Sequence, residues 1–209
     1  MIIAVDGPAA SGKGTIARAL ARHFGLPHLD TGSLYRAVAL SVIREDGDPE
    51  DAREATRHAE TLSSATLADP AIRSREIGAA ASIVSVHSGV RQALLAYQRE
   101  FAARPGGAVL DGRDIGTVIA PHADAKLFVT AATEERARRR TEELKGRGGS
   151  ADEKAILADL LARDARDSGR AEAPLAVAPG AAIIDTTALG VDEAIAAAIA
   201  AVQERVPPA

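Results

Sequence analysis

The chain has 209 residues, enough for one large domain or two small ones, and 46% of them are hydrophobic, which allows a sizeable core. Aromatic residues make up only 2% and cysteine is absent, which excludes base binding by several stacked aromatics, disulfides and cysteine-ligated metals. The formal net charge of −4 argues against bulk binding to a polyanion, and no apolar run reaches the ~18 residues of a membrane-spanning helix.

The first fifteen residues contain the best-defined motif of the chain. Residues 2–5 are apolar and rich in branched side chains, which predicts a strand buried on both faces. Residues 7–14 then read Gly-x-x-x-x-Gly-Lys-Gly, followed by Thr15, and apolar residues recur at helical spacing over 16–24. Strand, glycine loop, lysine and helix in this order are typical of a phosphate-binding P-loop.

The chemistry of phosphate binding explains this spacing. Glycines let the backbone come close to a ligand, and the loop's N–H groups can converge on phosphate oxygens at the positive end of the helix. Lys13 adds a mobile cation near the β- and γ-phosphates. An ordinary glycine turn is the alternative. The residues expected to bind the donor phosphates are Gly7, Pro8, Ala9, Ala10, Ser11, Gly12, Lys13, Gly14 and Thr15.

One position departs from the usual P-loop. Gly14 stands where a serine or threonine normally follows the lysine, and the hydroxyl comes one place later, on Thr15. A hydroxyl that would ligate Mg²⁺ directly is therefore shifted along the chain.

The next stretch predicts a short strand over 26–30 and a helix over 31–44, capped by Thr31 or Ser33. Arg36 would lie in the first turns of this helix, where a cation is unfavourable against the helix dipole unless an anion joins it. A solvated surface arginine is the alternative.

The segment up to about residue 104 is expected to be a helical side lobe. We predict helices over 49–62, 73–86 and 88–104, with a loop over 63–70. Residues 63–75 are too few for several paired strands, so no three-stranded sheet is expected there. Ser82 and Arg91 lie in this lobe, and from this stretch alone a small helix residue and a surface charge are the simpler interpretations.

Residues 106–111 predict a turn and a strand that ends in Asp111, followed by the polar run Gly112-Arg-Asp-Ile-Gly-Thr117. Open α/β sheets bind ligands at the carboxyl ends of their strands. Arg113 and Asp114 are therefore candidate ligand-binding residues, and a tight turn closed by aspartate side chains is the alternative.

A further strand over 125–129 precedes a helix with Arg136, Arg139 and Arg140 on one face. Like charges at this spacing repel by a few tenths of a kcal/mol, so an anion shared by the three would relieve them.

Residues 145–150 predict a hinge-like break, followed by a helix from about Asp152. On that helix, i,i+4 spacing predicts an ion pair between Arg163 and Asp167 and a like-charge pair between Arg166 and Arg170. A salt-bridged surface helix is the alternative.

The last elements are a strand over 181–185 and an alanine-rich helix over 191–206. Strands and helices alternate through the chain, with core strands near residues 2–6, 27–30, 107–111, 125–129 and 181–185. This pattern predicts an α/β fold: a five-stranded parallel sheet with helices on both faces and the ligand at the carboxyl ends of the strands.

Taken in order, the motifs closely resemble those of the bacterial cytidylate kinase family, among the P-loop nucleoside monophosphate kinases, over nearly the whole chain. The residues that carry the resemblance are Val5-Asp-Gly-Pro8, Ser11-Gly-Lys-Gly-Thr15, Asp30-Thr-Gly-Ser-Leu-Tyr-Arg36, Asp111-Gly-Arg-Asp-Ile-Gly-Thr117, Glu135-Arg-Ala-Arg-Arg-Arg140 and the cluster from Arg163 to Arg170. Many members carry a small β-sheet insertion in the acceptor lobe, for which residues 63–75 are too short.

The resemblance implies transfer of the γ-phosphoryl group of ATP to CMP or dCMP with Mg²⁺, which we expect to be held mainly by phosphates and water. It implies a P-loop kinase core of residues 1–30, 105–145 and 171–209, a helical acceptor-binding lobe over about 31–104 and a short lid over about 145–170. The chain opens on a strand rather than on a signal peptide, and we expect a cytoplasmic protein. We also expect a monomer with no nucleic acid or membrane partner.

The resemblance also assigns roles to residues. Arg36, Arg113 and Arg170 match the positions that hold the acceptor's phosphate. Three further positions read cytosine, where a carboxylate accepts from the N4 amino group and an arginine serves N3 and O2; they are Ser82, Arg91 and Asp114.

Other positions match sugar contacts, namely Arg163 and Asp167, while Thr31 and Tyr35 belong to the acceptor-binding motif. Arg136 and Arg140 could grip the donor phosphates. The residues implied to act in catalysis are Lys13, Arg113, Arg136, Arg140 and Arg170. No general base is needed, because the attacking phosphate oxygen is already ionised.

Two rival interpretations stay open. One is another small P-loop kinase that uses UMP, shikimate or a sugar, against which the paired Arg36 and Asp-Gly-Arg-Asp motifs argue. The other is a nucleotide-dependent switch without turnover. The chain lacks the Asn-Lys-x-Asp guanine motif of such switches and supplies its own arginines.

Overall fold

The structure is a computed structural model that describes residues 1–146 and 150–206. The chain divides into two compact units, one formed by Met1–Leu29 with Ala102–Ala209 and the other by Asp30–Phe101. Within the described residues, no helix is long and apolar enough to cross a membrane.

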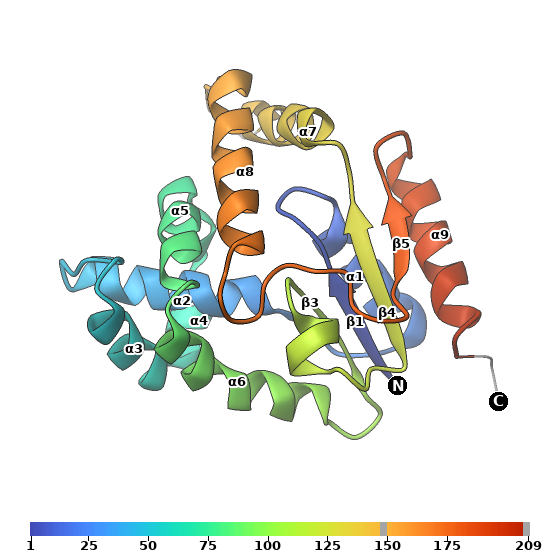
Figure 1. The fold of residues 1–209 in the computed structure, drawn as a ribbon, viewed down its shortest axis with the longest axis horizontal. Coiled ribbons are helices and arrows are strands. Elements are labelled where there is room, and N and C mark those ends of the chain that lie inside the picture. The colour runs from blue at the N-terminus through green and yellow to red at the C-terminus, as the bar shows by residue number, and fades with distance from the viewer. Residues whose placement is uncertain (147–149, 207–209) are drawn as a thin grey trace. The chain divides into compact units, whose positions relative to one another are not determined.

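Five parallel strands form the sheet of the first unit (Figure 1). In the spatial order β2-β3-β1-β4-β5 they are β2 (His28–Asp30), β3 (Ala108–Gly112), β1 (Ile2–Asp6), β4 (Ala125–Thr130) and β5 (Ala182–Asp185). The central strand β1 is buried on both faces, which explains its continuous apolar run. The predicted α/β class and strands are confirmed, each bound within two residues of its expected place.

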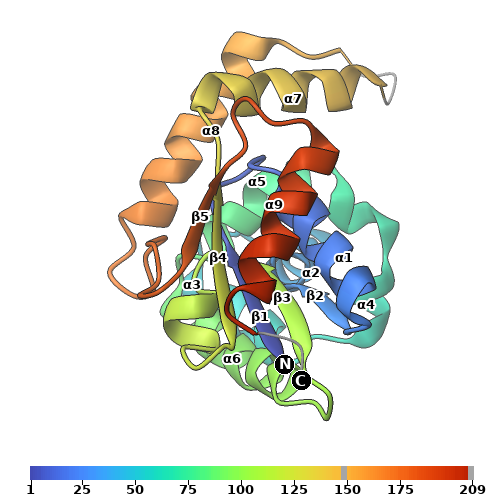
Figure 2. The ribbon, with the colours of Figure 1, turned by 90° about the vertical axis from the view of Figure 1, so that its right-hand side faces the viewer.

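The helices of the first unit are α1 (Lys13–Phe24), α7 (Thr133–Gly146), α8 (Glu153–Ser168) and α9 (Val191–Gln203). Helices α1 and α9 lie side by side along the sheet (Figure 2), where Ile16 and Val202 share one core with Val5 and Leu127. Helices α7 and α8 pack on each other around a small second core that also includes Ala9 of the glycine loop.

The polar run after β3, expected to be a loop, contains one turn of π-helix, η2 (Ile115–Ile119). The terminal helix ends at Gln203, three residues before the expected end. Of the predicted hinge at residues 145–150, Lys145 and Gly146 are the last two residues of α7, and residues 147–149 lie outside the described part.

The second unit is helical throughout its regular elements. These are α2 (Thr31–Arg44), α3 (Ala52–Glu60), α4 (Ser64–Ala68), the 3₁₀ turn η1 (Pro70–Arg73), α5 (Arg75–Val84) and most of α6 (Ser88–Ala102). The apolar face of α2, including Leu34 and Val38, is buried, and α2 packs against α3 and α5. Residues 60–80 contain α4, η1 and the start of α5, so the prediction of no three-stranded sheet there is confirmed.

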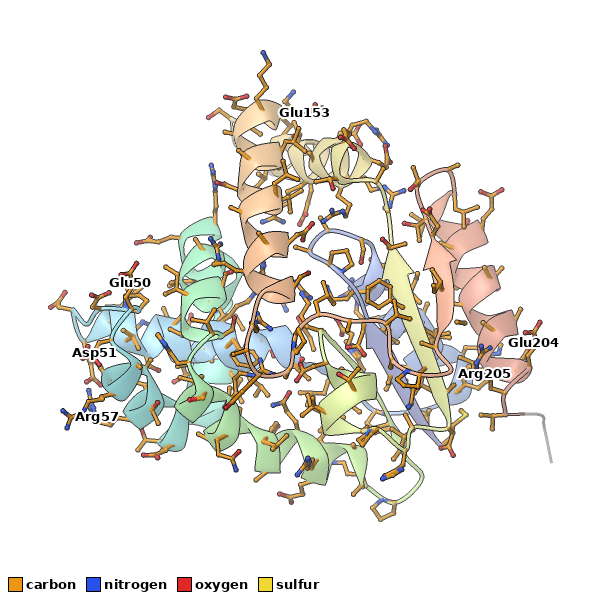
Figure 3. The ribbon with its side chains drawn as sticks, viewed as in Figure 1. Glu50, Asp51, Arg57, Glu153, Glu204 and Arg205 are labelled. Atoms are coloured by element: carbon orange, nitrogen blue, oxygen red, sulfur yellow. The ribbon has the colours of Figure 1, made fainter. Side chains whose placement is uncertain are left out.

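Capping side chains move several helix starts away from their predicted positions. Asp51, labelled in Figure 3, accepts from the amides of Arg53 (2.8 Å) and Glu54 (3.1 Å), so α3 begins at Ala52 rather than at Pro49. The predicted loop over 63–70 was wrong, because Ser63 caps the short helix α4 through the amide of Thr66 (3.2 Å).

The predicted cap of α2 was also wrong. Asp30 occupies the N-cap position and makes no side-chain cap hydrogen bond. The Ser33 hydroxyl donates instead to the Asp30 carbonyl at 2.6 Å. Thr31 is the first residue of the helix and is buried.

Candidate active site

The glycine loop between β1 and α1 has the backbone of a phosphate-binding loop. Gly7 has a φ of 153°, and a Cβ at this position would lie 2.0 Å from the Val129 carbonyl oxygen, so only glycine fits against β4. Gly12 caps α1 with a left-handed φ of 89°. The loop therefore leads directly into the positive end of a twelve-residue helix, where anions bind.

Protein donors bind three carbonyl groups of this loop. The Lys13 ammonium donates to the Pro8 carbonyl (3.3 Å), the Arg136 guanidinium to that of Ala9 (3.1 Å), and the Thr186 hydroxyl to that of Ser11 (3.1 Å). Arg136 lies on α7 and Thr186 follows β5, so segments far apart in the chain brace the loop. With these carbonyls engaged, the loop is suited to offer its amides to an anion.

One carboxylate, that of Asp111, lies beside the glycine loop. Asp111 lies on β3, and its Oδ2 is 3.6 Å from the place of a Cβ on Gly14, while its Oδ1 accepts from Nε2 of His28 at 2.6 Å. In the part of the chain that the structure describes, no group of three or more His, Asp or Glu side chains could hold a metal. One carboxylate beside the loop fits a Mg²⁺ ion whose other ligands are phosphates and water.

A cluster of arginines surrounds Asp167 on α8. Arg113 Nε donates to Asp167 Oδ2 at 2.7 Å, Arg170 donates to Oδ1, and Arg163 Nε lies 4.0 Å from Oδ2. Burial would raise the pKa of Asp167, but the positive charges of Arg113 and Arg170 outweigh it and hold this pKa below its usual value. Three guanidiniums around one carboxylate leave two positive charges in excess, which suits a doubly charged phosphate.

The ion pair and the like-charge pair predicted for α8 had different outcomes. The pair between Arg163 and Asp167 is confirmed. Arg170, which was predicted to form a like-charge pair with Arg166, pairs instead with Asp167.

Each of the three α7 arginines has acceptors within the protein. Arg136 is buried, and it donates to the carbonyls of Ala131 (3.0 Å) and Ala9 (3.1 Å), the Thr133 hydroxyl (2.7 Å) and Asp164 Oδ2 (2.7 Å). Each of the other two has its own acceptors: Arg139 pairs with Glu135 and Thr186, and Arg140 with Glu143 (2.6 Å). Acceptors within the protein therefore already offset the like-charge repulsion expected on this face, and the binding of an anion by these arginines stays a prediction.

These contacts predict a stability role for Arg136. We expect Arg136→Gln to lower the free energy of unfolding of the nucleotide-free protein by about 3 kcal/mol, because it leaves the Asp164 carboxylate and the Ala9 carbonyl without their donor. Urea denaturation measures this loss.

The matched control is Arg138→Gln on the same helix, because Arg138 is half exposed and its ion pairs with Glu135 and Glu142 lie at the surface of α7. Its stability should change by less than about 1 kcal/mol. Unchanged stability of Arg136→Gln, combined with a raised KM for ATP, would instead support the sequence-based role in gripping donor phosphates.

The second unit contains candidate residues on α2, α5 and α6. Arg36 Nη1 donates to the Ile72 carbonyl (3.2 Å) and lies 3.1 Å from the place of a Cβ on Gly78. Ser82 follows Gly78 by four residues, so the two lie on one face of α5, and Ser82 is buried. The Arg91 guanidinium lies 5.9 Å from the centre of the Tyr35 ring, in a cation–π contact.

Four residues at the site were missed from the sequence: Asp6, His28, Asp164 and Thr186. Asp6 and Thr186 lie at the carboxyl ends of β1 and β5, and the rule that drew attention to Asp111 and Asp114 would have found them too. His28 is a polar residue within a predicted strand, which was a usable signal. Asp164 gives no local signal, because its partner Arg136 is on another helix.

A parallel sheet with a phosphate loop after its first strand, helices on its flanks and arginines supplied by the same chain defines a P-loop kinase core. The family model described as cytidylate kinase matches residues 3–204. The chain therefore belongs to the cytidylate kinase family.

Curated relatives agree with this membership. The chain is 57% identical over 205 residues to a cytidylate kinase of Xanthobacter autotrophicus, with 98% of each chain covered. It is 56% identical over 199 residues to one of a Bradyrhizobium species (95% of this chain and 94% of the relative) and 60% identical over 181 residues to one of a Methylobacterium species (87% and 86%).

Two solved structures share the fold. An uncharacterized protein from Eubacterium ventriosum matches with a TM-score of 0.58 and 16% identity, covering 98% of this chain and 99% of the other. TT1252 from Thermus thermophilus matches with a TM-score of 0.51 and 22% identity, covering 100% and 98%.

Proposed function

We propose that the protein transfers the γ-phosphoryl group of ATP to CMP or dCMP, giving CDP or dCDP, in pyrimidine nucleotide metabolism. The observation that carries this proposal is the family match over residues 3–204, which includes every motif discussed above. The bracing of the glycine loop and the positive excess around Asp167 support it independently.

In this proposal the donor phosphates bind the amides of residues 7–15, with Lys13 beside the β- and γ-phosphates. A Mg²⁺ ion would screen the charge of the phosphates, and Asp111 would help to hold it, directly or through water. His28 binds Oδ1 of that carboxylate, and Oδ2 faces Gly14. Arg140 binds the donor phosphates, while Arg136 donates to the Ala9 carbonyl of the loop.

The acceptor phosphate binds Arg36, Arg113 and Arg170. Arg113 and Arg170 already have a carboxylate partner, Asp167, which fixes their guanidinium groups before the substrate arrives. Asp167 and Arg163 then contact the sugar.

The cytosine base binds Ser82, Arg91 and Asp114, and Thr31 and Tyr35 complete the acceptor contacts. A carboxylate as acceptor selects the N4 amino group of cytosine over the carbonyl of uracil.

Catalysis under this proposal is positioning and charge stabilisation. The phosphate of CMP is already ionised and attacks without a general base, and the arginines and Lys13 stabilise the charge that moves between the phosphates. Exclusion of water prevents hydrolysis of ATP. We assign the acceptor-binding lobe to residues 31–104 and the lid to residues 145–170, and we take the enzyme to be a cytoplasmic monomer.

An acceptor panel tests the proposal. ADP formation is followed with Mg²⁺-ATP alone and with CMP, dCMP, UMP or shikimate, and rapid turnover is expected only with CMP and dCMP. Preference for UMP or shikimate would indicate a different P-loop kinase. Nucleotide binding without turnover on any acceptor would indicate a binding module.

A further inference from the structure

Asp6 joins the end of β1 to the turn that carries the acceptor-reading residues. It lies immediately before Gly7 and is 3% exposed. Its Oδ1 accepts from the amide of Ile115 and its Oδ2 from the amide of Gly116, both at 2.8 Å. In the parallel pairing of β1 and β3, Asp6 lies opposite Gly112. Arg113 and Asp114 are the two residues between Gly112 and the amides that Asp6 binds.

The turn η2 depends on this carboxylate for its first amides. The N-cap of η2 is Asp114, which makes no side-chain cap hydrogen bond. The first amides of a helical turn have no acceptor within the turn itself, and Asp6 supplies acceptors for two of them from another strand. A Cβ at Gly116 would lie 3.0 Å from Cβ of Ala178 and 3.3 Å from Asp6 Oδ2, so the turn is closely packed against its cap.

Burial of the Asp6 carboxylate costs folding free energy, so this residue does more than fill space. Burial raises the pKa of Asp6 to about 6, although the amides of Gly116 and Ile115 act to lower it. The charge of Asp114 raises this pKa further and that of Arg113 lowers it. Lys126 also reaches the turn from β4. Both carboxylate oxygens accept a hydrogen bond from a backbone amide, which favours the ionised form.

We propose that Asp6 is a positioning residue for acceptor recognition, which holds η2 so that Asp114 meets the cytosine base and Arg113 the acceptor phosphate. The inference rests on the proposed function, since it concerns how CMP is held. It assigns no contact with substrate to Asp6 itself. It also ties the acceptor-reading turn to the residue that precedes the donor loop, so both sites are fixed to the same end of β1.

The variant Asp6→Asn tests the proposal by removing one acceptor while keeping the shape of the side chain. Its NH₂ group would face a backbone N–H, so one amide of η2 loses its partner. We expect KM for CMP to rise about tenfold or more, and the preference for CMP over UMP to fall about tenfold. KM for ATP should change less than about twofold, because the glycine loop keeps its own contacts.

The matched control is Asp124→Asn, which lies just before β4 and contacts the other end of β1. Asp124 is exposed, and its Oδ2 accepts from the amide of Ile2 at 2.7 Å. This variant also weakens a carboxylate-to-amide contact of β1, but far from η2, and all its kinetic constants should match those of the wild type.

The outcomes separate the inference from the function. A wild type that does not phosphorylate CMP refutes the proposed function. If the wild type phosphorylates CMP, the Asp6→Asn variant tests the positioning role alone. KM values for CMP and ATP that rise together, or that both stay unchanged, overturn that role. If Asp6→Asn does not unfold cooperatively, Asp6→Ser replaces it under the same criteria. Failure of both to fold would show that Asp6 serves folding, and would overturn the proposal as well.

Discussion

Replacement of Lys13 by methionine is expected to lower kcat by about 10²–10⁴-fold, because removal of one preorganised positive group from transferring charge commonly has an effect of this size. The Lys13 ammonium is half-buried at the start of α1 and donates to the Pro8 carbonyl within the glycine loop. It is no part of the apolar core, so the thermal unfolding midpoint should stay within about 3 °C of the wild type. Steady-state kinetics and thermal unfolding measure the two quantities.

The matched control for Lys13→Met is Arg22→Met, which removes a positive charge from the exposed last turn of the same helix. It should leave kcat unchanged. A near-normal kcat for Lys13→Met would mean that the glycine loop is not the donor site, whatever the activity of the protein.

The second large expected effect is discrimination between acceptors. UMP should be used with a kcat/KM about 10³-fold or more below that of CMP, since a site built to hydrogen-bond one group rejects an analogue that lacks it. Asp114 is buried at the N-cap of η2. There its carboxylate has little access to water, so a uracil carbonyl placed against it would go unsatisfied and be repelled.

The variant Asp114→Asn provides the internal test. An amide can donate to the uracil carbonyl, so the gap between CMP and UMP should narrow, mostly through a lower kcat/KM for CMP. Equal kcat/KM values for the two nucleotides in the wild type would show that Asp114 does not read the base.

The strands were predictable because short apolar runs rich in branched side chains are a local signal. Residues 2–5 and 125–129 are short apolar runs, and each became a strand within one residue of its expected bounds. Helix starts were less predictable, because capping side chains set them. Asp51 caps α3 although Pro49 is an equally plausible start, and Ser63 caps α4 within a stretch that reads as a loop. Polar composition alone suggested a loop where Ser63 caps a helix.

The candidate site was predictable in its residues but not in their partners. The chemistry of Arg113 and Asp167 could be inferred from motifs, whereas their bond at 2.7 Å joins residues 54 apart in the chain. Asp6 is 109 residues from the amide of Ile115 that it binds. Arg136 was expected to face a ligand, and only packing reveals that its guanidinium is buried among protein oxygens.

Transfer of label from γ-labelled ATP to CMP tests the central claim most directly. The proposed function predicts labelled CDP that forms only when CMP is present and that nearly disappears in Lys13→Met. Release of the label as inorganic phosphate at a rate independent of CMP, with no labelled CDP, would contradict it.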